Sequence, residues 1–290
     1  EMKNWALEMH DAGHIPGSAM ALIEMNGKRI CYSGDFKLQD TELHKGAEPP
    51  ENVDVLMIES TYANREHPDR KELEKKLKNE IWETLDDGGY VLFPCFAVGR
   101  SQEMVQMLNR FKIGEEIYLD GMAKAASDII LDFPSYVRDY DSLLRALKRV
   151  HWVRTPGMRK KVLSEPSVIV STAGMLEGGP AIGYLLSLNA KNKNSKVIFT
   201  GYSVENTNGW RVQNKRQMKT DRGLVDIELD IEYFDFSAHA GKSDLWKLVK
   251  DCSPEKVVCI HGDHCETFAQ ELREEGYDAV APKAGDKISV

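Results

Sequence analysis

Short apolar runs alternate with amphipathic stretches along most of the chain. Residues 53–59 and 167–171 form continuous apolar runs with the length and composition of buried strands. Residues 69–85 and 102–111 carry apolar side chains every three or four positions, with charges between them, as amphipathic helices do. Because strands that alternate with helices usually form a parallel sheet, the pattern predicts an α/β protein.

Turn and capping residues mark the ends of several predicted elements. Asn26-Gly27 is a strong hairpin signal and predicts strands over residues 18–25 and 28–32. Ser101 is suited to cap the helix at 102–111, and Pro180 is suited to open a helix that continues over 181–189. Further strands are predicted at 90–93, 116–120, 196–200 and 256–260, and further helices at 245–250 and 267–275.

Five polar side chains stand at or near the ends of strand-like apolar runs. They are His14, Asp35, Glu59, His239 and His261. In α/β folds, ligands bind beyond the carboxyl ends of the strands. We therefore expect these five side chains to converge on one site of metal-binding type.

The residue types suit hydrolysis assisted by metal ions. His14, Asp35 and His261 supply imidazole and carboxylate, which zinc prefers, and the Asp35 carboxylate could bridge two ions. A two-metal site activates water and stabilises the attacking and leaving oxygens of phosphodiester hydrolysis. Glu59 could orient His239, which could then protonate the leaving oxygen.

Structural roles for the same residues stay open at this point. A single histidine is more often a core or surface residue than a ligand, and Asp35 follows a glycine, as turn residues often do. His261 and His264 have the spacing of a separate HxxH zinc site, although no helical pattern supports it.

Composition narrows the class of protein. The 290 residues are enough for two lobes, and the sequence contains neither a membrane-length apolar run nor a visible signal peptide. The lack of such a run predicts no membrane association. The five cysteines are odd in number and include no CxxC pair, which predicts reduced thiols and a cytoplasmic location. The formal net charge of −8 argues against a protein that coats nucleic acid non-specifically, but it allows a local basic groove.

Several short motifs, taken in order, carry a family resemblance. GHIPGSA (13–19), SGDF (33–36), ESTY (59–62), FSAHAG (236–241) and IHGD (260–263) resemble the metallo-β-lactamase-fold nucleases of the β-CASP group. Within that group they resemble the cleavage-and-polyadenylation-factor and ribonuclease J type, most closely the archaeal cleavage-factor-like enzymes. PCFAVGRSQE (94–103), IYLDGMA (117–123), STAGMLEGGPA (171–181) and GYSVENTNGWR (201–211) resemble the β-CASP insertion.

The resemblance implies a role for each of the five polar residues. His14 matches a zinc ligand, Asp35 the carboxylate that bridges two zinc ions, and His261 a ligand of the second zinc. Glu59 matches a β-CASP acidic residue, and His239 the histidine assigned to protonation of the leaving group. The DNA-repair branch of the family has valine at the position of His261, so the histidine implies RNA as substrate.

The chain departs from the family in one respect. The HxHxDH motif, which supplies most of the family's zinc ligands, is absent. We therefore expect an αββα metallo-β-lactamase lobe that is incomplete at its N-terminus, formed by residues 1–65 and 225–290, with a β-CASP lobe inserted at 66–224. We also expect a fragment that is inactive alone and that forms a homodimer or associates with the missing N-terminal half.

Two glycine-containing turns are candidates for RNA phosphate binding. Ser171, Thr172, Gly174 and Met175 follow a predicted strand and precede a helix, and Arg100 and Ser101 stand in a similar position. Backbone N–H groups at such turns bind anions, although a glycine there can serve the turn alone. The basic residues at 145–161 fit either single-stranded RNA or a solvated helix face, and the basic run at 211–222 is predicted to be a surface loop.

The function expected from these features is zinc-dependent hydrolysis of RNA phosphodiester bonds, in RNA 3′-end processing or decay. Cleavage could be internal, from the 5′ end, or both. The alternative is a non-catalytic RNA-binding scaffold subunit, but such family members usually lose the motif histidines and aspartates that this sequence keeps. Thioester and lactam hydrolases of the same superfamily lack a β-CASP insertion.

Overall fold

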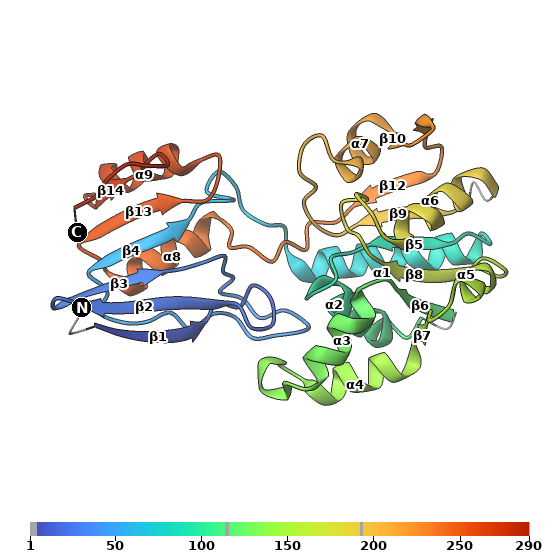
Figure 1. The fold of residues 1–290 in the computed structure, drawn as a ribbon, viewed down its shortest axis with the longest axis horizontal. Helices are drawn as coiled ribbons and strands as arrows, with labels where there is room; N and C mark the ends of the chain where they lie inside the picture. The colour runs from blue at the N-terminus through green and yellow to red at the C-terminus, as the bar shows by residue number, and fades with distance from the viewer. Residues whose placement is uncertain (1–4, 114–115, 192–193, 290) are drawn as a thin grey trace. The chain divides into compact units, whose positions relative to one another are not determined.

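The computed structural model describes residues 5–113, 116–191 and 194–289, and it divides into two compact units (Figure 1). The first unit contains the chain up to His67 and from Ala238 onward, and the second contains Pro68–Ser237. The boundary expected near residue 224 precedes β12 (Asp230–Tyr233), which pairs in parallel with β9 (Lys196–Phe199) of the second unit. The chain therefore returns to the first unit only at residue 238.

In its described part, the first unit holds a six-stranded mixed sheet in the order β1-β2-β3-β4-β13-β14. Its elements are β1 (Trp5–Asp11), β2 (Ala19–Met25), β3 (Lys28–Tyr32), β4 (Val55–Glu59), α8 (Lys242–Cys252), β13 (Lys256–Ile260), α9 (Cys265–Glu274) and β14 (Asp278–Val280). The first three strands are antiparallel neighbours, whereas β3, β4, β13 and β14 run parallel to one another.

One face of this sheet forms the core of the first unit. Leu22, Leu56 and Val257 pack with buried side chains of α8 and α9, including Leu248 and Phe268. Successive side chains of a strand point to opposite faces, so each strand also presents residues to the face away from this core. The two helices therefore cover one face of the sheet.

The other face is apolar and exposed along the edge strand β1. Trp5, Leu7 and Met9 alternate along β1 and are 54%, 52% and 60% exposed, and Tyr32 of β3 is also exposed. The register places Leu7 beside Ile23 of β2 on this face. An edge strand with exposed apolar side chains favours association.

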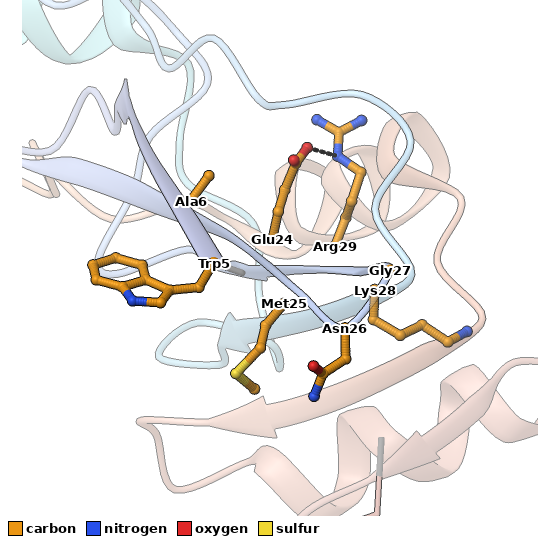
Figure 2. Close-up of a pocket in the computed structure, with 8 residues that line it drawn as sticks. All are labelled: Trp5, Ala6, Glu24, Met25, Asn26, Gly27, Lys28 and Arg29. Atoms are coloured by element: carbon orange, nitrogen blue, oxygen red, sulfur yellow. Dashed lines mark ion pairs between the residues drawn. The ribbon is translucent and has the colours of Figure 1, made fainter. Parts of the chain in front are cut away.

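A shallow pocket of about 620 Å³ lies where β1 begins, against the hairpin of β2 and β3 (Figure 2). Trp5 and Met25 stand on one face of the hairpin, whereas Glu24 and Arg29 form an ion pair of 3.1 Å on the other. This pocket adjoins the amino end of β3, opposite the carboxyl ends of the strands near Asp35. It is therefore separate from the predicted metal site.

The second unit is built around a parallel sheet in the order β12-β9-β5-β8-β6-β7. Besides β9 and β12, its elements are α1 (Arg70–Asp86), β5 (Val91–Pro94), α2 (Arg100–Phe111), β6 (Glu116–Asp120), α3 (Ala123–Leu131), the 3₁₀ turn η1 (Pro134–Tyr136), α4 (Tyr140–Arg149), β7 (His151–Trp152), α5 (Pro156–Val162), β8 (Ser167–Ser171), α6 (Pro180–Lys191), α7 (Asn208–Lys215), β10 (Gln217–Thr220) and β11 (Gly223–Asp226).

Helices cover both faces of the second sheet. Leu92, Ile169 and Val197 pack with Leu185 of α6, whereas the residues that alternate with them, such as Phe93, point to the other face. Helices α1 and α2 contact β5 and β8 there. The α/β class with a parallel sheet is thus confirmed.

In the described part of the chain, no helix combines the length and the apolar character needed to cross a bilayer.

Two local predictions are wrong. Helix α2 begins at Arg100 after Gly99, and the Ser101 hydroxyl donates to the Phe96 carbonyl oxygen (2.6 Å) instead of capping the helix. The basic run predicted as a surface loop contains the end of α7 and the β10–β11 hairpin, which are helical and paired structure.

Candidate metal centre

The five predicted site residues all lie in the first unit. Strands β3, β4 and β13 are parallel neighbours, so their carboxyl ends meet at one edge of the sheet. Asp35 follows β3, Glu59 ends β4, and His261 comes directly after β13. His14 lies in the connection from β1 to β2, and His239 lies just before α8. Contacts among these side chains bring the five together in one place.

Asp35 stands between two histidines. Its Oδ2 lies 3.9 Å from His14 Nε2, and its Oδ1 lies 3.4 Å from His261 Nε2. Ligand atoms of His14, Asp35 and His239 all lie within 4.8 Å of one another. A carboxylate whose two oxygens face different imidazoles fits a bridge between two ions, and imidazole with carboxylate is a donor set that suits zinc.

A backbone contact fixes the ring of His14. Its Nδ1 lies 3.1 Å from the Ala238 carbonyl oxygen. Since a carbonyl oxygen only accepts hydrogen bonds, Nδ1 carries the proton and Nε2 presents its lone pair on the side of Asp35. Burial, followed by the nearby His239, lowers the pKa of His14, which favours the neutral imidazole that a metal needs.

Glu59, which is buried, forms an ion pair with His239, which is partly exposed. Glu59 is 1% exposed, and its carboxylate accepts from His239 Nδ1 (2.9 Å), the Phe36 N–H (2.8 Å) and the Thr61 hydroxyl (2.5 Å). Burial alone would raise the pKa of Glu59, but these hydrogen bonds outweigh it, so the pKa is lowered. Burial acts to lower the pKa of His239, but the hydrogen bond and charge of Glu59 outweigh burial. The pKa of His239 is therefore raised. Both shifts favour the charged pair.

Lys37 contacts a loop of the site and Thr61 lies close to another, and neither residue was predicted from the sequence to belong to the site. The Lys37 ammonium is 3.3 Å from the His239 carbonyl oxygen, and the Thr61 hydroxyl is 3.4 Å from that of His261. Their positions next to SGDF and inside ESTY were visible in the sequence, but these contacts cross more than 190 residues. They depend on tertiary packing, which local patterns do not report.

The loop after β13 has an unusual backbone. His261 has a φ of +49°, in the left-handed region, and its carbonyl oxygen accepts from the Ser60 N–H (3.0 Å). A Cβ at Gly262 would lie 2.4 Å from the Ser60 carbonyl oxygen, so only glycine fits there. The loop that presents His261 is thus pressed against the end of β4.

The six predicted RNA-binding residues lie in the second unit. They are Arg100, Ser101, Ser171, Thr172, Gly174 and Met175, at the carboxyl ends of the neighbouring strands β5 and β8. Arg100 pairs with Glu103 and donates to the Phe236 carbonyl oxygen, and Ser101 and Ser171 are fully buried. The backbone of the turn, with Met175 partly exposed, is therefore the part that a ligand could reach.

Two family models match the chain. The Beta-Casp domain matches residues 101–212, within the second unit. The Zn-dependent metallo-hydrolase RNA specificity domain matches residues 224–282, which include His239 and His261.

Relatives with related names match nearly the whole chain. The chain is 38% identical to the probable RNase MJ4 of Methanocaldococcus jannaschii, over 99% of the chain and 69% of that protein. It is 35% identical to RNase aCSPSF2 of Saccharolobus solfataricus, over 100% of the chain and 60% of the relative. It is 34% identical to the transcription termination factor FttA of M. jannaschii, over 92% of the chain and 47% of the relative. The chain belongs to the β-CASP family of metallo-β-lactamase-fold ribonucleases.

Proposed function

We propose that this chain carries the catalytic residues of a zinc-dependent ribonuclease that hydrolyses phosphodiester bonds of single-stranded RNA. The main support is one arrangement: the Asp35 carboxylate faces His14 and His261, beside the pair of Glu59 and His239. Relatives named as RNases and a family model named for RNA specificity support the choice of RNA.

In this proposal each side chain has one task. His14, Asp35 and His261 hold zinc, which when bound supplies a Lewis acid and lowers the pKa of water. The Glu59 carboxylate stabilises protonated His239 through Nδ1, and His239 donates a proton to the oxygen that leaves the phosphorus. Lys37 fixes the loop of His239, and the Ser60 N–H fixes the loop of His261.

The second unit supplies RNA binding in the same proposal. Ser171, Thr172, Gly174 and Met175, with Arg100 and Ser101, frame a site for backbone phosphates at the ends of β5 and β8. Because the side chains of Arg100 and Ser101 are engaged within the protein, their role is to shape the turn.

The biological setting that fits is RNA 3′-end processing or decay in the cytoplasm, by internal cutting, 5′→3′ degradation or both. The chain spans 69%, 60% and 47% of the lengths of the three relatives. We therefore assign the activity to the whole enzyme, in which this chain has either a second copy or a further segment as its partner. A non-catalytic scaffold has no need of the Asp35 arrangement or the Glu59–His239 pair, and both are present.

The test is to substitute Asp35. In the polypeptide of full natural length, Asp35→Asn should lose bound zinc and RNA cleavage together, while RNA affinity stays. Asp251→Asn, on an exposed position of α8 in the same unit, should keep all three properties. Cleavage by Asp35→Asn at the wild-type rate would reject the proposal, and absence of cleavage by a zinc-loaded wild type would favour the scaffold.

A further inference from the structure

Three loops of the second unit form one surface at the carboxyl ends of adjacent strands. They are residues 95–99 after β5, 172–179 after β8 and 200–207 after β9; together they are called the strand-end surface. Cys95 Sγ lies 4.0 Å from Thr200 Oγ1, and a Cβ at Gly174 would lie 3.1 Å from the Phe96 nitrogen. The Met175 carbonyl oxygen accepts from the Gly209 N–H (2.7 Å) just beyond the third loop. The three loops are therefore in mutual contact.

The strand-end surface exposes large apolar side chains. Phe96 and Val98 of the first loop are 43% and 40% exposed, and Tyr202 and Val204 of the third loop are 56% and 47% exposed. Water-exposed rings gathered at one surface are a mark of an interaction site.

The backbone that carries these side chains is firmly held. The Phe96 carbonyl oxygen accepts from both the hydroxyl and the N–H of Ser101. The Val204 carbonyl oxygen likewise accepts from the hydroxyl (2.5 Å) and the N–H (3.1 Å) of Thr207. The rings are thus presented on an ordered backbone, which reduces the entropy lost when a ligand binds.

We propose that Phe96 and Tyr202 are stacking positions for unpaired nucleobases of single-stranded RNA. The inference rests on the proposed function and adds recognition of bases to the binding of phosphates. Proteins hold single strands without strong sequence preference by stacking successive bases on aromatic rings beside a backbone-binding groove. Here the turn at Gly174 and Met175 packs directly against Phe96, so a backbone site and a ring are neighbours.

The exposed apolar side chains of the surface are interrupted by polar ones, which favours stacking of bases over a protein partner. In the third loop, exposed Tyr202 and Val204 flank the buried Ser203, and the exposed polar residues Glu205 and Asn206 follow. The core of a protein interface is continuous and apolar, whereas stacking needs only isolated rings with open faces. Phe133 and Tyr136 provide a contrast in the same unit, because these exposed rings pack on each other, 6.4 Å apart between centroids.

The experiment compares two ligands of equal length. Fluorescence anisotropy would give the dissociation constants of the chain for a labelled uridine oligomer and for the abasic ribose-phosphate oligomer, at several salt concentrations. Phe96→Ala and Tyr202→Ala should each weaken binding of the base-bearing oligomer roughly 5- to 150-fold and leave abasic binding unchanged. The dependence on salt should stay the same, because phosphate contacts remain.

Matched variants separate stacking from other effects. Tyr202→Phe keeps the ring and should bind like the wild type, as should Phe133→Ala, which removes an exposed ring elsewhere. Thermal unfolding of every variant shows whether the fold is kept; for a variant that unfolds, Phe96→Leu or Tyr202→Leu takes its place, since leucine keeps apolar volume without a ring.

The outcomes distinguish this inference from the proposed function. Equal losses on both oligomers, or no loss on either, overturn the stacking role. If the variants change only self-association, the surface binds protein and the inference is wrong. If the wild type binds neither oligomer, RNA binding fails as a whole. If stacking is observed but the full-length enzyme does not cleave, only the proposed hydrolysis fails.

Discussion

At the scale of single residues, the site depends on two oriented imidazoles with different electrostatic surroundings. Burial lowers the pKa of His14, whose Nδ1 donates to a carbonyl oxygen, whereas the Glu59 carboxylate outweighs burial and raises the pKa of His239. A neutral ring suits a metal ligand, and a protonated ring suits a proton donor. These surroundings support the separate roles proposed for the two rings.

Substitution of His239 tests that assignment. His239→Ala should keep zinc and RNA affinity but lower the cleavage rate by about 10²- to 10⁴-fold, because proton donation is lost. Zinc content and single-turnover cleavage would be measured on the same full-length preparation, with His151→Ala, in an exposed ion pair of the second unit, as the control. Loss of zinc from His239→Ala would instead make His239 a ligand, which its place within 4.8 Å of the other ligand atoms permits.

A second buried carboxylate, Asp120, makes stability depend on pH. It is fully buried and accepts from Lys124 (2.8 Å), Arg159 (2.7 Å) and the Tyr184 hydroxyl (3.0 Å). Burial acts to raise its pKa, but Arg159 and Lys124 outweigh burial, so the pKa is lowered. A lowered folded-state pKa adds stability above the unfolded-state value of about 3.9 and loses it as pH falls through the folded-state value.

Asp120→Asn should therefore destabilise the chain most at neutral pH. A broken buried ion pair costs about 3–5 kcal/mol, and because Arg159 is partly exposed we expect roughly 2–3 kcal/mol here. Urea unfolding at pH 7 and at pH values below 4 would measure the difference from wild type, which should shrink in acid. A constant difference, or an equal effect of the exposed control Asp128→Asn, would contradict this account.

At the scale of elements, a substitution in the turn after β8 tests whether this turn binds phosphate. A Cβ at Gly174 would press on backbone atoms of the β5 loop at 3.1–3.2 Å, whereas a Cβ at Gly178 would meet nothing within 4 Å. Gly174→Ala should thus displace the turn, weaken RNA binding and reduce the slope of log affinity against log salt by about 0.7 for each lost phosphate. Gly178→Ala is the matched control in the same turn. Unchanged affinity and slope for Gly174→Ala would leave the turn a purely structural role.

Regular elements were predictable where packing and pattern agree. Strands β3, β6, β8 and β13 have the predicted bounds, because the last three are largely buried runs and the Asn26-Gly27 turn marks the start of the first. The edge strand β1 was missed although Trp5, Leu7 and Met9 alternate with polar or small residues. Its alternation was therefore visible in the sequence, and the strand was overlooked. Ser101 has the type of an N-cap, but a carbonyl five residues earlier accepts its hydroxyl proton.

The site was predictable to the extent that strand ends determine it. Asp35, Glu59 and His261 stand at or just after the ends of three strands that are parallel neighbours, so their proximity follows from topology. The hydrogen bond from Lys37 to the His239 carbonyl oxygen was not predictable in this way, because it joins segments 202 residues apart. Such contacts become visible only when the fold is known.

At the scale of the whole molecule, the ligand set limits metal affinity. If Asp35 bridges, each zinc has two protein ligands among the residues named here, whereas tight zinc sites use three or four. The 290-residue chain alone should therefore lose zinc to a mild chelator and cleave RNA negligibly. Addition of the segment by which the longer relatives exceed it should restore both. Full occupancy by two zinc ions, with rapid cleavage by the chain alone, would show that the ligand set is sufficient.

The exposed face of the first sheet should make the chain associate. Trp5, Leu7 and Met9 line an edge strand, so a second copy or a further strand can cover them. Sedimentation should show concentration-dependent dimers, and the summed emission of the five tryptophans should shift to shorter wavelength as Trp5 is covered. Leu7→Lys should remove both effects, whereas Glu8→Lys, on the other face of β1, should not. A monomer at high concentration would contradict this expectation.

The left-handed backbone at His261 bears on how this position can evolve. For a residue with a Cβ, that conformation costs about 1–2 kcal/mol, and asparagine or glycine adopts it more easily than histidine. Selection for stability alone would thus replace His261. We expect lineages that still need the imidazole to retain it, and lineages freed from that need to drift toward asparagine or glycine within the same loop.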